Sequence, residues 1–312
     1  MTYMENQFMF FTGFADEAAV SLDGQIEATL KLGWKFIESR SIDNVNIHDL
    51  PEEQFEIACG KLADAGISVN CFGSTVANWQ RPVFDEAGWE LSREQLKRAL
   101  VRMQKLNCKI IRGMSFLGAY ERPTAFDPEV EAWVFPRVCE LVKMCADAGV
   151  MYGHENCRNY GGMSYKHTLK LIEAVNNPNF TLIYDIGNPV FNVDYSSGKS
   201  EGKHQNSWEF YSNVKEFISY VHIKDGRIEF DEKGEKKEIF TFPGEGNAFV
   251  KEIVTDLIAN GYDGGFSIEP HMGAVFHDAN AVSSDEYRFN NYVEYGRRFE
   301  KMVADIKNKL GK

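Results

Sequence analysis

The feature of this sequence that most restricts its fold is a strand–helix alternation that repeats eight times. Each short apolar run has the length of a buried strand, and the stretch that follows has the apolar spacing of an amphipathic helix. No segment of linker composition interrupts the series, so we expect a single α/β domain over residues 1–312, folded as a (βα)8 barrel. The expected strands are residues 8–14, 36–37, 67–72, 109–114, 150–153, 180–184, 220–223 and 266–268.

An open, doubly wound parallel sheet with a helical appendage is the alternative fold for such an alternation. Sheets of that kind that bind dinucleotides carry a Gly-x-Gly-x-x-Gly turn after the first strand. Here the first strand leads into Ala15, Asp16 and Glu17 instead. The missing glycine turn and the count of eight repeats favour the closed barrel.

Capping residues set the expected helix boundaries. Ser92, with Gln95 three residues later, has the spacing of a capping box and predicts the start of the third helix. Asn247 is expected to cap a helix whose apolar face begins with Phe249. The charged excursion over residues 227–238 is typical of a hairpin.

Net charge and composition exclude several classes of partner. The net charge of −12 argues against non-specific binding of nucleic acid, which requires a basic surface. No apolar run reaches the length of a membrane-spanning helix, and the N-terminal segment lacks the basic region of a signal peptide. The six cysteines show no CxxC pair and no disulfide-like spacing, which indicates free thiols. We therefore expect a cytoplasmic protein with no nucleic-acid or membrane partner.

Four potential metal ligands stand at the ends of the last four expected strands: Glu155, Asp185, His222 and Glu269. The carboxyl ends of the strands meet at one mouth of a (βα)8 barrel, where such enzymes keep their chemistry. A single acidic residue at a strand end is often only solvated or a helix cap, but four on neighbouring strands indicate one site. Three carboxylates and one imidazole form a hard ligand set that suits Mn²⁺ or Mg²⁺, with Co²⁺ and Zn²⁺ as alternatives.

The residues around these four positions resemble a known family. The motifs are GHEN at Glu155, YDIGN at Asp185, VHIKD at His222 and SIEP at Glu269. They resemble the xylose-isomerase-like TIM barrel family, which includes sugar isomerases and epimerases, inosose dehydratases, endonuclease IV and the metal subunits of C-glycoside deglycosidases. The resemblance implies a TIM barrel that binds one divalent metal, with Mn²⁺ favoured, through these four residues. It also implies that Glu155 and Glu269 are catalytic and transfer protons on opposite faces of the substrate.

Departures from the family pattern separate this chain from the nuclease branch. Asn188 stands where many members have a histidine, three residues after the aspartate of the sixth strand. Endonuclease IV also needs histidines after earlier strands to hold three zinc ions, and the loops FGSTVANW and RGMSF contain none. The ligand count and the acidic charge therefore exclude a trinuclear zinc nuclease.

Further polar and aromatic residues near the expected barrel mouth are second-tier candidates. His271 follows the last strand and is a candidate for an added catalytic acid or base, although a loop histidine is often merely exposed. The candidates for substrate binding, each with an ordinary structural role as the alternative, are Lys224, Arg227, Asn188, Trp79, Trp208 and His277.

Three functions fit this set of residues. The first is a metal-dependent isomerase or epimerase that removes the proton beside the carbonyl of a ketose or keto-sugar and forms an enediolate. The second is a lyase that begins in the same way and then eliminates a group from a 3-keto-glycoside or an inosose, with His271 as the added acid. The third is a non-catalytic sugar-binding barrel. We expect a small carbohydrate as partner and a homo-oligomer, or a hetero-oligomer with a small subunit if the protein is of the C-glycoside deglycosidase type.

Overall fold

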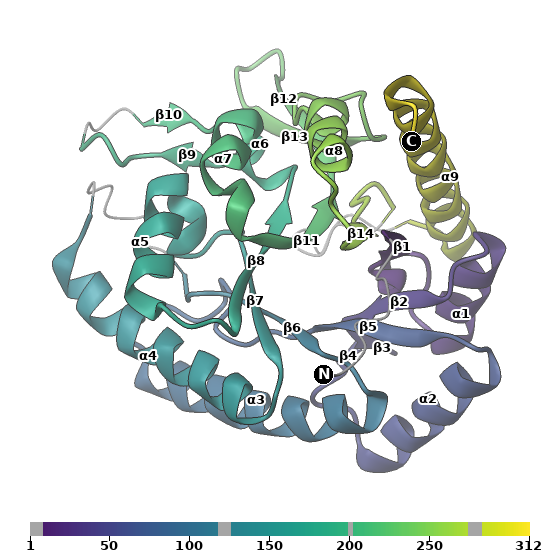
Figure 1. Ribbon diagram of the computed structural model, residues 1–312, viewed down its shortest axis with the longest axis horizontal. Helices are drawn as coiled ribbons and strands as arrows, with labels where there is room; N and C mark the ends of the chain where they lie inside the picture. The colour runs from purple at the N-terminus through teal and green to yellow at the C-terminus, as the bar shows by residue number, and fades with distance from the viewer. Residues whose placement is uncertain (1–8, 118–125, 199–201, 274–282) are drawn as a thin grey trace.

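A computed structural model of the chain describes residues 9–117, 126–198, 202–273 and 283–312. Eight parallel strands form one sheet in the order β1-β14-β11-β8-β7-β6-β5-β2. A parallel bridge between Phe14 and Glu38 joins the two ends of this order, so the sheet curls into a barrel (Figure 1) and the (βα)8 prediction is confirmed. The strands are Phe10–Gly13 (β1), Phe36–Ser39 (β2), Ser68–Gly73 (β5), Ile110–Gly113 (β6), Met151–Glu155 (β7), Phe180–Asp185 (β8), Ile218–Ile223 (β11) and Gly265–Ile268 (β14).

The main helices lie outside the ring of strands and follow them in turn (Figure 1). Their bounds are Leu22–Lys31 (α1), Glu52–Asp64 (α2), Glu86–Leu106 (α3), Pro128–Asp147 (α4), Tyr165–Val175 (α5), Ser207–Val214 (α7), Val250–Ala259 (α8) and Asp285–Leu310 (α9). Short 3-10 helices cover Ala15–Glu17 (η1), Gly161–Met163 (η2) and Lys215–Phe217 (η3).

Short elements decorate the carboxyl ends of the strands. Among the described residues, three antiparallel pairs and one short helix are inserted between the main repeats, and the predicted hairpin near residues 227–238 is the longest of them. They are Ser41–Ile42 (β3) with Val45–Asn46 (β4), Val193–Asp194 (β9) with Lys203–His204 (β10), Asp225–Phe230 (β12) with Lys236–Thr241 (β13), and Asn188–Phe191 (α6).

The barrel has two apolar clusters because successive side chains of a strand face opposite sides of the sheet. The larger cluster includes Leu182 and Val221, together with side chains of the outer helices. The smaller cluster contains Cys71, Ile183 and Tyr220 and fills the interior of the ring. Ile183 and Tyr220 are direct partners in the register of β8 and β11. Because residues two apart on a strand share a face, the inward direction of Ile183 and Tyr220 shows which later side chains on β8 and β11 also point inward.

The third helix begins earlier than the sequence predicts. It starts at Glu86, and Ser92 lies inside it, where the hydroxyl donates to the carbonyl oxygen of Gly88. Trp89 is only 6% exposed, and its burial against the barrel extends the helix over residues before the expected cap. The capping box predicted at Ser92 and Gln95 is therefore wrong, because both are buried helix-interior residues.

Helix α8 also begins differently. Asn247 does not cap it, because Phe249 intervenes in the left-handed conformation, with φ of 58°, and the helix starts at Val250. The loop before the helix is organised by the carboxylate of Asp225 instead. Its oxygens accept hydrogen bonds from the backbone N–H groups of Gly226, Gly244, Gly246 and Ala248.

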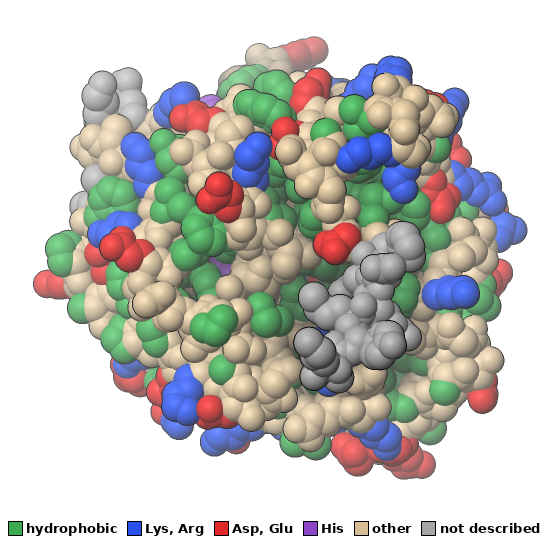
Figure 2. Space-filling model, in the orientation of Figure 1, with side chains coloured by type: hydrophobic (Ala, Val, Ile, Leu, Met, Phe, Trp, Pro, Cys, Tyr) green, Lys and Arg blue, Asp and Glu red, His purple; other side chains and the backbone are tan. Residues whose placement is uncertain are grey.

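The helices and the surface charge can be compared with what a membrane or nucleic-acid partner would require. No helix within the described ranges is long and apolar enough to cross a membrane. On the face shown in Figure 2, acidic and basic side chains are intermixed. An intermixed face of this kind is unlike the basic stripe on which nucleic acid binds.

Candidate metal and active site

Strand alternation aims two polar side chains into the barrel. Asp185 follows Ile183 by two residues on β8, and His222 follows Tyr220 by two residues on β11. Residues two apart on a strand share a face, and Ile183 and Tyr220 belong to the inner cluster. Asp185 and His222 therefore enter the interior at the carboxyl ends of their strands.

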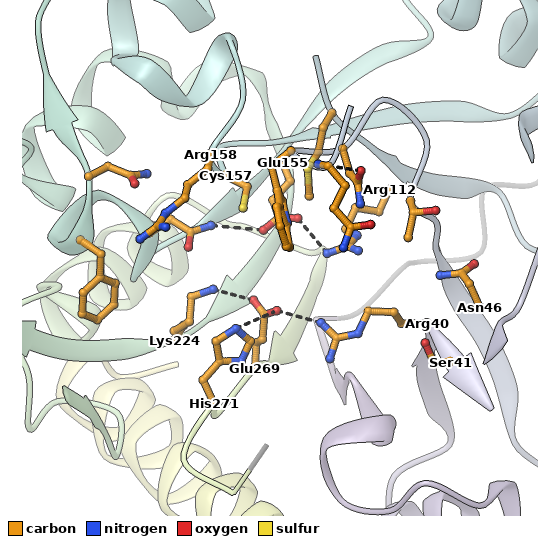
Figure 3. A pocket seen from close by; sticks show the side chains of 18 of the residues that line it. Arg40, Ser41, Asn46, Arg112, Glu155, Cys157, Arg158, Lys224, Glu269 and His271 are labelled. Atoms are coloured by element: carbon orange, nitrogen blue, oxygen red, sulfur yellow. Dashed lines mark hydrogen bonds and ion pairs between the residues drawn. The ribbon is translucent and has the colours of Figure 1, made fainter. Parts of the chain in front are cut away.

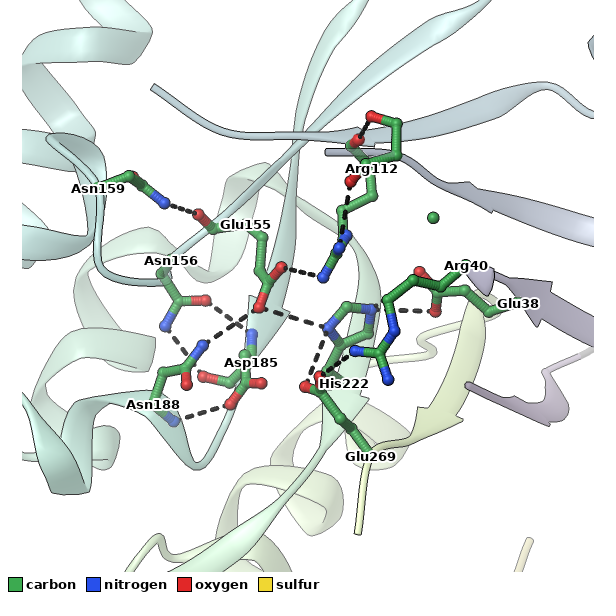
Figure 4. A network of polar contacts seen from close by, with 12 residues as sticks. Glu38, Arg40, Arg112, Glu155, Asn156, Asn159, Asp185, Asn188, His222 and Glu269 are labelled. Carbon is green, nitrogen blue, oxygen red and sulfur yellow. Dashed lines mark hydrogen bonds and ion pairs between the residues drawn. The ribbon is translucent and has the colours of Figure 1, made fainter. Parts of the chain in front are cut away.

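Glu155 at the end of β7 and Glu269 just after β14 complete a cluster of four with these two residues. One ligand atom from each of the four lies within 4.8 Å of the others. None of the four residues is more than 3% exposed. Figure 4 shows the four side chains converging from neighbouring strands. The structure thus brings together the residues that the sequence analysis selected as metal ligands.

Glu38 on β2 fixes the orientation of the His222 ring. Its carboxylate oxygens lie 3.2 and 3.0 Å from Nε2 of His222, so Nε2 carries a proton that it donates to Glu38. The hydroxyl of Ser267 donates to the same carboxylate over 2.6 Å. The other ring nitrogen, Nδ1, faces the cluster of carboxylates. A carboxylate behind a histidine in this way is the usual support of a metal-binding imidazole.

Two buried arginines balance the two glutamates. Arg112 donates from Nη1 to Oε2 of Glu155 over 3.0 Å, and Arg40 donates from Nη1 to Oε1 of Glu269 over 3.2 Å. Burial acts to raise the pKa of Glu155, but Arg112 outweighs it and the pKa falls to about 2. Burial also opposes ionisation of Glu269, whereas Lys224 and His271 bring its pKa well below the usual value. Both glutamates are therefore ionised at neutral pH.

Lys224 bridges the remaining carboxylates. Its Nζ lies 2.7 Å from Oδ2 of Asp185 and 2.8 Å from Oε2 of Glu269. Burial raises the pKa of Asp185 to about 7, because Lys224 offsets only part of the cost of burying this carboxylate. Asp185 is thus the carboxylate of the cluster whose charge the neighbouring side chains compensate least.

The donor set fits a divalent cation. Nδ1 of His222 is buried without a hydrogen-bond partner in the described chain, and its nearest carboxylate oxygens, on Glu155 and Glu269, are 3.8 and 3.9 Å away. Burial lowers the pKa of His222, but Glu38 and Glu155 outweigh it and raise the pKa to about 10, so at neutral pH Nδ1 carries a proton that a bound cation would replace. Once that proton leaves, the Nδ1 lone pair and the three carboxylates together form a donor set that a hard metal ion satisfies.

A second group of potential ligands contains Glu17, Glu269 and His271. The guanidinium of Arg40 already lies against it, with Nη2 3.5 Å from Oε1 of Glu17 and Nη1 3.2 Å from Oε1 of Glu269. Asp16 holds Arg40 in this place through two hydrogen bonds of 2.8 and 3.0 Å. A permanent cation at this position disfavours a second metal ion beside the first.

A cavity of about 320 Å³ opens over the cluster. In Figure 3, Lys224, His271 and Glu269 lie on one side of it, and Ser41 and Asn46 lie across from them. The lining residues are Arg40, Ser41, Asn44, Asn46, Thr75, Asn78, Trp79, Gln80, Arg112, Met114, Glu155, Cys157, Arg158, Asn188, Phe191, Asn192, Lys224, Glu238, Phe240, Glu269 and His271.

The substrate-binding candidates divide by their place relative to this cavity. Trp79, Asn188 and Lys224 line it, and the side-chain amide of Asn188 donates to Oε1 of Glu155 over 3.2 Å. Trp208 is not among its described lining residues; it is 39% exposed on the outer helix α7. Arg227 is also outside the described lining, because its guanidinium bonds to Glu229 on the hairpin. His277 lies outside the described residues.

His271, the predicted additional acid or base, lines the cavity beside Glu269. Glu17 accepts hydrogen bonds from both its backbone N–H, over 2.7 Å, and its ring Nδ1, over 2.8 Å. His271 has a φ of 54°, a left-handed conformation that is uncommon for a residue other than glycine. Such backbone conformations persist only where surrounding contacts impose them, and they concentrate at functional sites.

Arg40, Arg112, Glu38 and Glu17 are the members of the site that sequence reasoning missed. Glu38 lies in the second strand and Arg40 directly after it, and the sequence analysis selected neither as a site residue. The signal for Arg112 was a charged residue inside the apolar run 109–114, where it reaches the barrel interior only if paired. For Arg40 and Glu38, the partners Glu269 and His222 are far away in sequence, and local patterns do not reveal such pairs.

Comparison with known proteins decides the family. The model of the Xylose isomerase-like TIM barrel family matches residues 26–289. This chain belongs to that family. The resemblance seen in the four strand-end motifs is therefore confirmed.

The proteins to which this chain is similar carry different names within the family. The inosose dehydratase of Geobacillus thermodenitrificans (strain NG80-2) is 25% identical over 220 residues, 63% of this chain and 68% of that protein. The structure of a D-tagatose 3-epimerase-like protein superposes with a TM-score of 0.70 at 17% identity and covers 97% of this chain and 100% of that one. A Xylose isomerase-like TIM barrel protein from Mycobacterium smegmatis, solved in complex with magnesium, gives a TM-score of 0.66 at 16% identity, with coverage of 97% and 100%. At such identities, the structural likeness establishes the fold.

Proposed function

We propose that this protein is a divalent-metal-dependent enzyme that removes the proton beside the carbonyl of a ketose or keto-sugar and thereby isomerises or epimerises it. The observation that carries the proposal is the pair of ionised glutamates, Glu155 and Glu269, in one buried cluster that opens into a cavity. The similarity to an epimerase-like structure and to an inosose dehydratase supports the same substrate class.

The metal would be held by Glu155, Asp185, His222 and Glu269, and the hard ligand set favours Mn²⁺, with Mg²⁺, Co²⁺ and Zn²⁺ as alternatives. A structurally similar protein was solved in complex with magnesium, which supports a divalent ion. When bound, such an ion polarises a carbonyl and makes the neighbouring C–H more acidic. One ion is proposed because Arg40 holds the adjacent acidic group.

The chain's own residues supply the proton transfer. Arg112 and Lys224 keep the two glutamates ionised, and an ionised carboxylate accepts the proton from carbon. Glu155 and Glu269 come from β7 and from the end of β14, which β8 and β11 separate in the sheet. Two bases that approach from separate strands allow removal of the proton on one face of the substrate and its return on the other.

His271 supports a lyase as the second candidate function. A lyase needs an acid that protonates the leaving group after the first proton has been removed. Glu17 holds the ring of His271 through Nδ1, and its Nε2 lies 3.8 Å from Oε1 of Glu269. This placement beside the candidate base is that of a second proton-transfer group, as elimination from an inosose or a 3-keto-glycoside requires.

Solvent exchange tests the proposed function. Metal-loaded protein in deuterium oxide is incubated with D-fructose, scyllo-inosose or a 3-keto-glucoside, and deuterium beside the carbonyl is measured by NMR. We expect incorporation that falls by about 10²–10⁴ in Glu155→Gln and Glu269→Gln. Bound metal is measured in every sample, because both residues are proposed ligands. The exposed Glu140→Gln is the matched control and should match the wild type.

The outcomes separate the candidate functions. His271→Ala should retain exchange in either case, but a lyase would lose release of the leaving group. Binding of a sugar without any exchange would favour the non-catalytic barrel. Conversion of a sugar without deuterium incorporation would contradict proton abstraction and favour transfer of hydride.

A further inference from the structure

The lining of the cavity includes a threonine that is backed by a buried histidine. Thr75, two residues after β5, lines the cavity. His48 lies behind it between β4 and α2, and it is 0% exposed. Oγ1 of Thr75 is 2.9 Å from Nε2 of His48. The metal-ligand cluster uses neither residue.

The backbone identifies which nitrogen of His48 carries the proton. The N–H of Thr75 donates to Nε2 of His48 over 3.3 Å, so Nε2 is a lone-pair acceptor. In the neutral ring the proton then resides on Nδ1, where Oδ2 of Asp49 lies 3.1 Å away. Burial lowers the pKa of His48 to about 4, although Asp49 acts in the opposite direction, so the ring is neutral at neutral pH.

The tautomer of His48 determines the polarity of the Thr75 hydroxyl. An oxygen lone pair and a nitrogen lone pair facing each other at 2.9 Å would repel, so the hydroxyl hydrogen must point at Nε2. Within the described chain, Oγ1 of Thr75 makes no other hydrogen bond. Its oxygen therefore offers only acceptor lone pairs to whatever occupies the cavity.

We propose that Thr75 is a specificity residue that accepts a hydrogen bond from a substrate hydroxyl, with His48 and Asp49 as positioning residues. The proposal rests on the proposed function and narrows it to substrates with a free hydroxyl at this wall. A deprotonated phosphate or carboxylate has no hydrogen to donate to Thr75. Because the hydroxyl hydrogen of Thr75 is already donated to His48, the Thr75 oxygen would repel such an anion.

The charges around the cavity support a neutral substrate. The arginines and lysine in the described lining each pair with a carboxylate: Arg40 with Asp16 and Glu269, Arg112 with Glu155, Arg158 with Glu238, and Lys224 with Asp185 and Glu269. A phosphate site usually offers an uncommitted arginine fork or a row of backbone N–H groups. Here the charged groups pair with carboxylates, and the lining also offers hydroxyl and amide side chains such as Thr75 and Asn78.

The first arm of the test is independent of the substrate. Nitrogen-15 NMR of histidine-labelled metal-loaded protein, assigned with His48→Gln, reports which ring nitrogen of His48 is protonated. We expect a neutral ring with Nδ1 protonated and Nε2 bare. A ring protonated on Nε2 would overturn the polarity of Thr75 whatever the sugar measurements give.

The second arm uses D-fructose and scyllo-inosose, each with derivatives in which one hydroxyl away from the carbonyl is replaced by hydrogen or by fluorine. Fluorine accepts but does not donate a hydrogen bond, so an acceptor site should reject both derivatives alike. At the carbon whose hydroxyl contacts Thr75, we expect the deoxy and the fluoro derivative each to show a kcat/KM for exchange about tenfold or more below that of the parent sugar. Thr75→Val should abolish this preference and affect KM more than kcat, and Thr75→Ser should restore it.

A matched control separates recognition from stability. Thr29→Val removes a buried hydroxyl that bonds to the carbonyl of Gln25 on α1, outside the cavity, and should leave the preference unchanged. A fluoro derivative that exchanges like the parent sugar at every carbon, or a preference that survives Thr75→Val, would overturn the proposal. If His48 has the expected tautomer but the protein neither binds the two sugars nor exchanges their hydrogen, the proposed function is overturned. The proposed contact of Thr75 with a substrate hydroxyl then falls as well.

Discussion

Glu38 holds Nε2 of His222 at 3.0 Å and so leaves Nδ1 as the nitrogen that faces Glu155, Asp185 and Glu269. The pair connects β2 to β11 across the interior of the barrel. Neither atom of this contact is exposed to solvent, because both side chains have an exposed fraction of 0%. The orientation of the imidazole is therefore set before any ion binds.

Substitution of this supporting carboxylate should weaken metal binding without unfolding the protein. In Glu38→Gln the amide oxygen can still accept from Nε2, but the charge that makes the imidazole a stronger ligand is gone. We expect affinity for Mn²⁺ to fall about 10–100-fold, measured by competition with a chelator. The exposed Glu140→Gln serves as the control of equal chemistry. Equal affinity in Glu38→Gln and wild type would show that the contact does not support a ligand.

Asp185 should be required for the bound ion. Protein purified without chelator should contain about one equivalent of divalent metal by elemental analysis, and Asp185→Ala should lose it. The expected ratio is one because Arg40 already neutralises the neighbouring group of Glu17 and Glu269. A fully active protein free of metal would contradict the assignment, as would two equivalents that both depend on Asp185.

The buried pair of Arg112 and Glu155 should be strongly coupled. Removal of one partner leaves an uncompensated charge in the interior, which costs about 3–5 kcal/mol. Arg112→Met should therefore lower the free energy of unfolding, measured by urea denaturation with EDTA present. The double variant with Glu155→Gln should recover part of that loss. Additive effects of the two substitutions would show that the pair is not coupled.

His154 should make stability depend on pH. Its side chain faces away from that of Glu155, the next residue on β7, and its Nε2 lies 2.9 Å from Oγ of Ser115. Burial lowers the pKa of His154 from 6.5 to about 4, so the unfolded chain binds this proton more readily than the folded one. The stabilisation is complete above pH 6.5 and is lost as the pH falls toward 4.

The comparison with His154→Gln isolates this group. The difference in unfolding free energy between wild type and variant should shift in favour of the variant as the pH falls from 6.5 to 4. Denaturant titrations with EDTA present at several pH values measure the difference. A difference that is constant over this range would show that His154 protonates equally well in the folded state.

The convergence of the side chains at the strand ends could be predicted from the sequence because it follows from the geometry of a closed barrel. Asp185 and His222 end apolar runs whose parity fixes their direction, and closure of the ring brings distant strand ends together. Glu38 and Arg40 were equally visible at a strand end, yet their function depends on partners across the barrel. Local patterning gives the direction of a side chain but not which charge it meets.

The predicted starts of α3 and α8 were wrong for a related reason. Ser92 has the right neighbours for a cap, but burial of Trp89 extends α3 upstream of it. Asn247 has the right chemistry for a cap, but Asp225 organises its loop from another part of the chain. In both cases a tertiary contact outweighs a local preference worth about 1 kcal/mol.

The four backbone hydrogen bonds gathered by Asp225 have a consequence for how this scaffold can change. They tie the start of β12 to the loop before α8, so both stems of the β12–β13 excursion are fastened directly beside Lys224. The tip of the excursion is exposed, while Glu238 and Phe240 on its returning strand reach the cavity. If the proposed function holds, the length and sequence of the hairpin can therefore change, in evolution or by grafting, and alter which substrates fit, while the residues of the proposed site stay in place.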